Sequence, residues 1–280
     1  MDKIANFIRL MQMVKERKSM EILLCVKQVP DDSVEIHLDN EGKKPNLNGV
    51  SLVANAFDTY ALELAVRFME AHGGNVSVLT VGADDSLNTL KNCLAVGAKE
   101  AFFVKDDLYA DLDAIGASDV LADTIHKIEK DKGEKFDLIL CGKESTDEIT
   151  GQVGAMLAEK LGTGYLSSAI KIDLKDNVME IHQETEEGYN LVSLECPAVV
   201  TVSKPDYDPR YPTIKSKMAS RKAVIPTYCA VEIGEVKQAK VRLIEYVEPP
   251  KKEAGIKIQE KDELIAVSAA MEQMKKDKAI

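Results

Sequence analysis

Four short apolar segments, each followed by a segment with helical spacing, constrain the fold of this chain more than any other feature. They are 21–29, 76–81, 101–104 and 136–141. Apolar side chains at most of their positions are typical of strands that are buried on both faces of a sheet. Parallel neighbouring strands need crossover connections, and helices supply them. The first half is therefore predicted to be an α/β layer, a mostly parallel sheet with helices on both faces.

The helices between these strands can be placed from apolar spacing and from turn residues. Apolar side chains recur at helical spacing over 57–68 and over 87–94, and glycines follow both segments. Asp113 stands where it can cap a third helix, and a fourth is expected to run from about Thr150 to Leu161. A helix thus follows each of the four strands, as a Rossmann-like layer requires.

The hydrophobic pattern changes after Gly164. Apolar and polar residues alternate from 170 to 195, which is typical of antiparallel strands with one solvent-facing side. The segment 198–202 returns to the fully apolar type, and 34–38 alternates over a length that suits a short hairpin arm. Antiparallel strands are therefore expected in addition to the parallel sheet.

These patterns divide the chain into three parts. Residues 1–19 either form an amphipathic helix or precede a functional start at Met20, which is favoured because the first strand follows Met20 directly. Residues 20–225 hold the α/β pattern and form the main domain. Residues 226–280 have little core pattern of their own. They are expected to form an arm that leads to a helix over 262–276, whose apolar stripe needs a surface to pack on.

Composition argues against several function classes. The formal net charge is −11 and the chain has no tryptophan, so a nucleic-acid-binding surface is not expected. No apolar stretch reaches the roughly 20 residues of a membrane span. The five cysteines never stand as CxxC, which disfavours a metal site or a disulfide framework. Reduced thiols indicate a cytoplasmic protein.

No side-chain catalyst can be picked out from the sequence. The four histidines lie in separate predicted elements, and nothing resembles a nucleophilic triad. A chain that binds a cofactor and leaves the chemistry to it fits these residues better than an enzyme with catalytic side chains of its own.

The segment 141–162 is the strongest candidate for a binding site. It joins a predicted strand to a predicted helix and is rich in hydroxyl, amide and glycine residues. Ligands of open α/β sheets lie outside the carboxyl ends of the strands, and a helix N-terminus offers free N–H groups to a phosphate. Thr150 can cap the helix, and Gly151 lets the backbone approach a ligand. The alternative is an ordinary capped helix, because Ser145 and Glu148 fit a capping box. The spacing leaves both interpretations open.

Six segments stand in a specific order along the chain, although each is weak alone. They are LLCVKQVPD, NAFDTYALELAVRF, NCLAVGAKEA, LILCGKESTDEITGQVGAMLAEKLG, CPAVVTVSKPDYDPRYPTIKSKMASRK and EYVEPPKKEAGIKI. In this order and spacing they resemble the β subunit of electron-transfer flavoproteins, from about Met20 to the end. The resemblance implies an adenine nucleotide in the α/β domain. It is a structural AMP in simple members and, in electron-bifurcating members, an FAD that accepts a hydride from NADH.

The resemblance also implies which residues hold this nucleotide. The adenosine would lie beside the first two apolar strands and the start of the first helix, and the phosphates would lie at the helix that starts near Thr150. The implied cofactor residues are Cys25, Asn55, Ala56, Phe57, Asp58, Val81, Gly82, Ser145, Thr146, Asp147, Thr150, Gly151, Gln152 and Val153. The residues that follow Asn55 look more like the bifurcating type, which favours FAD over AMP.

Partners follow from the same resemblance. The loop 204–211, from Lys204 to Tyr211, matches the family's recognition loop for partner flavin dehydrogenases, such as an acyl-CoA or a lactate dehydrogenase. The C-terminal arm matches the segment that wraps the α subunit, which would carry a second FAD. Electrons would pass to ferredoxin and, through the α-subunit FAD, to the dehydrogenase.

Two further observations bear on this interpretation. Asp32 stands where simple members can carry an aromatic residue that reaches the α-subunit flavin, so that contact is not expected here. A stand-alone nucleotide-binding module of the universal-stress type is a third interpretation. The C-terminal arm argues against it, because a monomeric module has no use for an arm without a partner.

Overall fold

The computed structural model describes residues 19–109, 112–175, 178–234, 239–250 and 255–280. The chain forms two compact units. The first comprises Met1–Ile36 and Leu47–Ile244, and the second comprises His37–Asn46 and Glu245–Ile280. Apart from Ser19, the extension 1–19 and the amphipathic helix considered for it lie outside the described residues. The first unit includes the chain beyond Pro226, where the sequence pattern places the start of the arm.

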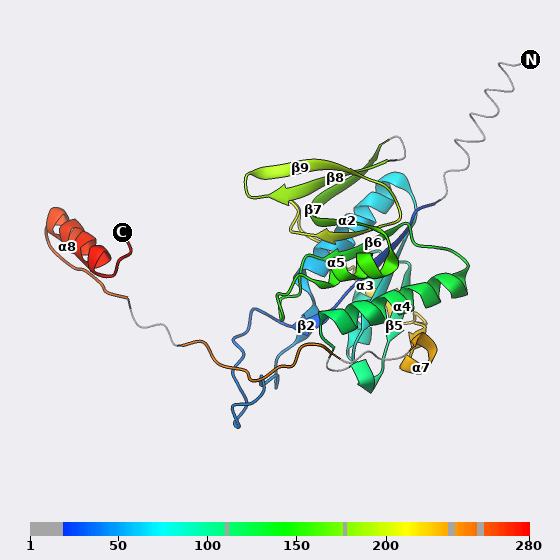
Figure 1. Ribbon diagram of the computed structural model, residues 1–280, viewed down its shortest axis with the longest axis horizontal. Coiled ribbons are helices and arrows are strands. Elements are labelled where there is room, and N and C mark those ends of the chain that lie inside the picture. The colour runs from blue at the N-terminus through cyan, green and yellow to red at the C-terminus, as the bar shows by residue number, and fades with distance from the viewer. Residues whose placement is uncertain (1–18, 110–111, 176–177, 235–238, 251–254) are drawn as a thin grey trace, which may run out of the picture. The chain divides into compact units, whose positions relative to one another are not determined.

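Over the described residues, the first unit is built on a nine-stranded sheet (Figure 1). In spatial order its strands are β11 (Thr227–Tyr228), β5 (Glu100–Val104), β4 (Asn75–Val81), β1 (Glu21–Cys25), β6 (Leu138–Gly142), β10 (Ala198–Val202), β7 (Gly164–Lys175), β8 (Val178–Thr185) and β9 (Gly188–Leu194). Neighbouring strands are parallel from β11 to β7 and antiparallel from β7 to β9. The predicted fold class, a mostly parallel sheet with additional antiparallel strands, is confirmed.

Helices cover both faces of the parallel strands (Figure 1). They are α2 (Ala56–His72), α3 (Ser86–Val96), α4 (Ala114–Lys132) and α5 (Val153–Leu161). α2 and α3 pack on one face, and α4 and α5 pack on the other. In the central strand β1, Ile22 and Leu24 join the first core, whereas Leu23 and Cys25 join the second. Because side chains alternate along a strand, a continuous apolar run is what allows both faces to be buried.

The strand order places a topological switch point between β1 and β6. From β1 the chain moves to β4 and then to β5 on one side, with α2 and α3 as crossovers. Helix α4 then returns the chain to β6, on the other side of β1. Ligands of open α/β sheets bind outside the carboxyl ends of the strands at such a point. Cys25 and Gly142, the last residues of β1 and β6, mark this place.

The segment 21–29, expected as a single strand, is split into two. β1 ends at Cys25, and β2 (Gln28–Pro30) pairs with β3 (Leu52–Ala54) in a separate antiparallel sheet. The break occurs where the N–H of Lys27 donates to a side chain of α2 rather than to a neighbouring strand. The segment is apolar on both sides of this point, so its composition did not reveal the break.

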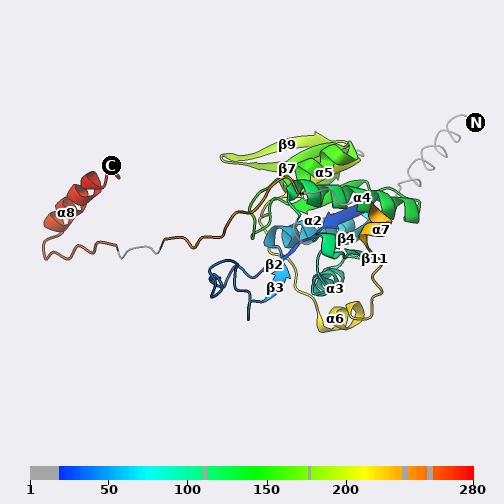
Figure 2. The ribbon, with the colours of Figure 1, turned by 60° about the horizontal axis from the view of Figure 1, so that its bottom comes forward.

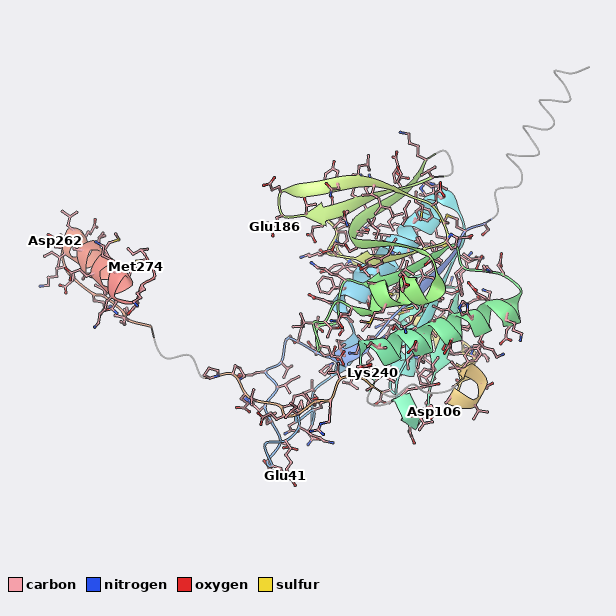
Figure 3. The ribbon with its side chains drawn as sticks, viewed as in Figure 1. Glu41, Asp106, Glu186, Lys240, Asp262 and Met274 are labelled. Atoms are coloured by element: carbon pink, nitrogen blue, oxygen red, sulfur yellow. The ribbon has the colours of Figure 1, made fainter. Side chains whose placement is uncertain are left out.

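Several shorter elements complete the first unit. They are a 3₁₀ turn (Asp107–Tyr109), α6 (Ile214–Ser220) and α7 (Ala230–Ile233). α6 lies beside α3 (Figure 2). The predicted antiparallel strands are confirmed as β7, β8 and β9, and Glu186 stands at the tip of the β8–β9 hairpin (Figure 3).

The second unit contains the C-terminal helix α8 (Glu263–Lys276), which confirms the helix expected over 262–276. Asp262 caps it, because its carboxylate accepts a hydrogen bond from Leu264 N–H at 2.8 Å. None of its described residues is buried, and the apolar side chain of Leu264 belongs to a residue that is 78% exposed. The hairpin arm expected at 34–38 is wrong: only an isolated bridge between Leu38 and Pro45 is present.

Candidate functional site

A cavity of about 620 Å³ opens at the carboxyl ends of β1, β4, β5 and β6. The N-terminal parts of α4 and α5 form the rest of its wall. This volume lies in the range of small-molecule and cofactor pockets. The cavity therefore occupies the place where the strand order predicts a ligand.

Two polar residues at the start of α2 fasten the segment 143–152 beside the cavity. The side-chain amide of Asn55 donates to Glu144 O at 2.8 Å, and its Oδ1 accepts from Thr146 N–H at 3.1 Å. Asp58 accepts from Lys27 N–H at 2.7 Å and from Gly142 N–H at 2.8 Å. Asn55 stands at the N-cap position of α2, but its side chain makes no capping hydrogen bond. It binds the segment 143–152, the cavity loop, instead.

Asp58 is only 4% exposed, and its environment changes its acidity. Burial raises the pKa of Asp58 to about 7, although the N–H groups of Lys27 and Gly142 favour the ionised form. A side chain on Gly142 would not fit above it, because a Cβ there would stand 2.8 Å from Phe57 Cβ and closer still to Asp58 Oδ1. The carboxylate is thus built into the floor that joins β1 to β6.

The start of α5 supplies backbone N–H groups to the cavity. Gly151 has a positive φ of 60°, and Gln152, the N-cap, is helical with φ −102° and ψ −29°. Such a sequence of left-handed and right-handed residues turns successive N–H groups toward one point, where an anion can bind. The N–H groups of Gly151 and Gln152 have no acceptor among the described residues. The helix starts at Val153, three residues after the predicted start at about Thr150, and its N-cap is Gln152, so the prediction of Thr150 as the cap is wrong.

Neither does the alternative capping box form. Residues 146–148 are a turn, closed by a hydrogen bond from Ile149 N–H to Ser145 O at 2.9 Å. Ile149 then has a positive φ of 54°, which prevents the turn from continuing as a helix. The free helix start is therefore displaced to Val153, beside the cavity.

Three lysines line the cavity, and two of them are neutralised. Lys27 Nζ lies 2.9 Å from Asp147 and 3.3 Å from Glu148, and Lys105 Nζ lies 2.7 Å from Asp84. Lys143 makes no ion pair with any residue that the structure describes. Its positive charge is thus available to a bound anion.

Two thiols lie side by side on the cavity floor. Cys25 and Cys141 are register partners on the parallel strands β1 and β6, and both are buried. A hydrogen bond with Cys25, together with burial, raises the pKa of the Cys141 thiol well above its usual range. The Cys141 thiol is therefore neutral, and the two sulfur atoms present a polarizable, weakly polar surface to a ligand.

The far wall of the cavity is tied to the segment before the second unit. Asp113 accepts from Gly116 N–H at 2.8 Å, which confirms it as the cap of α4, and from Lys240 N–H at 2.6 Å. Asp106 accepts from Ala230 N–H at 3.0 Å. Asp106 and Lys240 are labelled in Figure 3. Two aspartates of the cavity wall thus hold the chain that leads toward its C-terminus.

The structure brings together most of the residues predicted for the nucleotide. Those that line the cavity are Cys25, Asn55, Asp58, Val81, Gly82, Ser145, Thr150, Gly151, Gln152 and Val153. Four do not: Ala56 and Phe57 lie in the first turn of α2, Thr146 is bonded to Asn55, and Asp147 is paired with Lys27.

Sequence reasoning missed another group of residues that line the cavity. They are Lys27, Lys105, Tyr109, Leu112, Asp113, Ala114, Ala117, Leu121, Gly142, Lys143 and Gly154. For Lys105, Gly142 and Lys143 a signal existed, because each stands just after the end of a predicted strand. The rule that ligands bind at these ends could have found them.

A family model described as the electron transfer flavoprotein domain matches residues 48–232. This chain belongs to the electron transfer flavoprotein family. The match covers the cavity residues from Asn55 to Gly154 and continues through the loop 204–211.

Several curated members of the electron transfer flavoprotein family are similar over most of the chain. The subunit beta of Megasphaera elsdenii is 33% identical over 273 residues, which cover 93% of this chain and 100% of that protein. The subunit beta of Syntrophomonas wolfei is 30% identical over 253 residues, 90% of this chain and 95% of that protein. The caffeyl-CoA reductase-Etf complex subunit CarD of Acetobacterium woodii is 32% identical over 216 residues, 77% of this chain and 80% of CarD. Within the family, the chain is a β subunit.

The described residues show neither a membrane span nor a metal cluster. No helix among them is long and apolar enough to cross a membrane. No three of their histidine, cysteine, aspartate or glutamate side chains cluster in a way that could hold a metal ion.

Proposed function

We propose that this β subunit holds FAD in the cavity and serves NADH oxidation, with the electrons divided between ferredoxin and, through an FAD of the α subunit, a partner flavin dehydrogenase. The observation that carries the proposal is the cavity of about 620 Å³ with a free helix start on its wall. When bound, FAD would supply the hydride acceptance and the single-electron transfer. The chain itself would supply binding, orientation and electrostatics.

The phosphates of the nucleotide fit the start of α5. The N–H groups of Gly151, Gln152 and Val153 are free for hydrogen bonds, and the helix dipole favours negative charge there. Lys143 adds a positive charge without a carboxylate partner among the described residues. Gly154 lets α5 pack closely, because a Cβ at this position would collide with the side chain of Thr201. These residues would bind and orient the phosphates without a P-loop lysine.

The ring systems fit the less polar part of the wall. Val81, Leu112 and Leu121 contribute apolar side chains, and Cys25 and Cys141 form the floor. Such a surface excludes water and leaves a ring few polar groups to satisfy. We propose that these residues pack on the adenine or the flavin.

Asn55 and Asp58 would preorganise the site. Their hydrogen bonds to Glu144, Thr146, Lys27 and Gly142 hold the cavity loop and the ends of β1 and β6 in place. A site whose loops are held in place loses less conformational entropy on binding. Both oxygens of Asp58 accept from backbone N–H groups, so we assign Asp58 to positioning rather than to proton transfer.

The exposed apolar residues of α8 support an α subunit as partner. Leu264, Ile265 and Val267 are each more than half exposed. Exposed apolar side chains in a row are typical of a surface that another protein covers. We propose that the C-terminal arm and α8 pack on the α subunit, and that the loop 204–211 docks a flavin dehydrogenase of the acyl-CoA or lactate type. The name of the similar CarD places that protein in a caffeyl-CoA reductase–Etf complex.

AMP is the second candidate ligand. AMP is the adenylate half of FAD. The free N–H groups and the cavity loop held by Asn55 lie where its phosphate would bind. With AMP the subunit would be a simple electron carrier, and the nucleotide would only stabilise the fold. In either case we propose a cytoplasmic location, in keeping with the five free cysteines.

Identification of the bound nucleotides tests the proposal. The chain is co-expressed with its α subunit, the heterodimer is denatured, and the released nucleotides are separated and quantified by chromatography. Two FAD per heterodimer, with ferredoxin reduction that depends on NADH, are the expected result. One FAD and one AMP would overturn bifurcation and support the simple carrier.

A further inference from the structure

An arginine of the loop 204–211 binds helix α2 at two positions that are about two turns apart. Arg210 donates from Nε to Glu63 Oε2 at 2.8 Å and from Nη1 to Glu70 Oε1 at 2.6 Å. Its Nη2 reaches both carboxylates, Glu63 Oε1 at 3.2 Å and Glu70 Oε2 at 2.9 Å. The backbone N–H of Arg210 also donates to Glu63 Oε2, at 3.1 Å. Both the side chain and the main chain of the loop are therefore fixed.

The grip, meaning the bonds of Arg210 to Glu63 and Glu70, is buried at Glu63 and reaches the surface at Glu70. The side chain of Glu63 is only 2% exposed, and it also accepts from Arg67 Nε at 2.5 Å. Burial acts to raise the pKa of Glu63, but hydrogen bonds from Arg210 and Arg67 hold this pKa below its usual range. The carboxylate is therefore ionised at neutral pH and keeps both arginines. Arg67 in turn lies 3.9 Å from the centre of the Tyr207 ring, a second contact with the loop.

The other side of the loop is open to solvent. Tyr211, next to the anchored arginine, is 92% exposed, and Ile214 and Met218 of α6 are 82% and 61% exposed. Thr213 caps α6, with its hydroxyl accepting from Ser216 N–H at 3.1 Å. The side of the loop that faces α2 is thus fixed, whereas Tyr211 and the adjoining helix α6 present apolar side chains to solvent.

We infer that Arg210 is a positioning residue for docking: its bonds to Glu63 and Glu70 hold the loop 204–211 in the conformation that receives the partner flavin dehydrogenase. This inference rests on the proposed function, in which the loop is the docking site. The planar guanidinium with its five N–H donors can serve two carboxylates at once, which a lysine cannot. Without these bonds, the loop would sample other conformations. Its apparent affinity for the dehydrogenase would then fall in proportion to the population of the docking conformation.

The test uses the heterodimer with its α subunit and a purified acyl-CoA dehydrogenase that exchanges electrons with the wild type. The variants are Arg210→Gln, Arg210→Lys and Glu70→Gln. Arg221→Gln is the matched control, because it removes one positive charge at the end of α6 without touching α2. Three quantities are measured: amide hydrogen exchange over 203–212, kcat and KM for the dehydrogenase, and nucleotide content.

We expect Arg210→Gln to speed exchange in the loop and to raise KM for the dehydrogenase roughly tenfold, with kcat and nucleotide content unchanged. Arg210→Lys should recover part of the loss, and Arg221→Gln should change neither quantity. Glu70→Gln keeps the buried pair intact and should raise KM by a smaller factor, which keeps the inference testable if Arg210→Gln does not assemble.

Two results would overturn the inference. Unchanged exchange in Arg210→Gln would show that the grip does not fix the loop. Faster exchange with an unchanged KM would show that loop fixation does not matter for docking. The exchange measurement needs no dehydrogenase, so it tests the bonds of Arg210 by themselves. A wild type that passes no electrons to any acyl-CoA or lactate dehydrogenase would count against the proposed function and not against these bonds.

Discussion

Helix α2 fastens a loop at each of two places, and it does so by different means. At its start, Asn55 and Asp58 hold the cavity loop and the ends of β1 and β6 through hydrogen bonds to backbone groups. Further along, Glu63 and Glu70 hold the loop 204–211 through the guanidinium of Arg210. The first attachment is buried and joins main-chain groups, whereas the second reaches the surface and joins opposite charges.

Because of this difference, the first attachment should contribute mainly to the stability of the fold, and the second mainly to the position of the loop 204–211. A buried backbone N–H that loses its acceptor destabilises the native state. The N–H gave up its hydrogen bond to water on folding and has no hydrogen bond in the protein to replace it. A partly exposed ion pair contributes little to stability and is weakened by salt. Changes at the start of α2 should therefore affect the whole protein, and changes at Glu70 should affect the loop.

The largest expected effect is a pH dependence that arises from Asp58. Its pKa is about 7 in the native state, against about 3.9 in an unfolded chain, so the native state binds a proton that the unfolded state lacks. Stability contributed by this proton is present at low pH and is lost as pH rises toward the native pKa. Over about pH 4 to 7 the loss is roughly 4 kcal/mol.

The measurement is the free energy of unfolding of the heterodimer against pH, for the wild type and Asp58→Asn. Asparagine does not titrate, so the difference between the two curves isolates Asp58 from the other carboxylates. The difference should fall with rising pH and level off above about pH 7. A constant difference would contradict the raised pKa.

Asp58→Ala should lower the free energy of unfolding by about 3 kcal/mol, because the N–H groups of Lys27 and Gly142 lose their acceptor. Urea denaturation of the heterodimer measures this change. Asp58→Asn keeps one acceptor oxygen and should cost about half as much. Equal stability of the alanine variant and the wild type would remove the distinction between the two attachments of α2.

Gly151→Asp should weaken nucleotide binding roughly tenfold, which corresponds to about 1.4 kcal/mol, by placing a carboxylate at the positive end of α5. Gly151→Asn is the matched control: both residues tolerate the positive φ of 60° about equally, and they differ in charge. Titration of the nucleotide-free heterodimer with FAD and with AMP gives the two affinities. Equal affinities in the two variants would place the phosphates elsewhere.

The sheet could be predicted from the sequence because its signal is local. Strands such as β1 are apolar at successive positions, and Asp113 was recognised as a cap because a cap and its helix are neighbours in the chain. The carboxyl ends of the strands then indicated where a ligand would bind. Fold class and the approximate place of the site therefore followed from patterns within short segments.

The details of the site could not be predicted, because they depend on residues far apart in the chain. Asn55 and Thr146 are 91 positions apart, and Asp58 and Gly142 are 84 apart. No short pattern records such pairs, so Asn55 and Asp58 were interpreted only as contacts for the nucleotide. The start of α5 was misplaced for another reason. Ile149 adopts a positive φ, which no rule of sequence assigns to a β-branched residue.

Ile149→Asn should stabilise the protein by about 1 kcal/mol, since asparagine adopts a positive φ at lower cost than a β-branched residue. Ile149 is 66% exposed, so little packing is lost. Thermal unfolding measures the change, and Ile149→Val, which keeps the branched Cβ, should leave the stability as it is. A destabilised asparagine variant would mean that the isoleucine side chain has a contact that offsets its backbone strain.

The smallest effect is expected at Glu70, where α2 meets the loop 204–211 at the surface. Glu70→Gln should lower the free energy of unfolding by only about 0.5 kcal/mol, because the Glu70 side chain is 54% exposed and its pair with Arg210 is screened by water. In about 1 M salt, where charges are screened within about 3 Å, the difference should disappear. The loss of stability in Asp58→Ala should persist at the same salt concentration, because backbone hydrogen bonds in a buried site are not screened.

Glu159→Gln, on α5 without an ion pair among the described residues, controls for the loss of a surface charge. If the effect of Glu70→Gln were as large and as insensitive to salt as that of Asp58→Ala, both attachments of α2 would be parts of one core, and the loop 204–211 could not be loosened without unfolding the cavity.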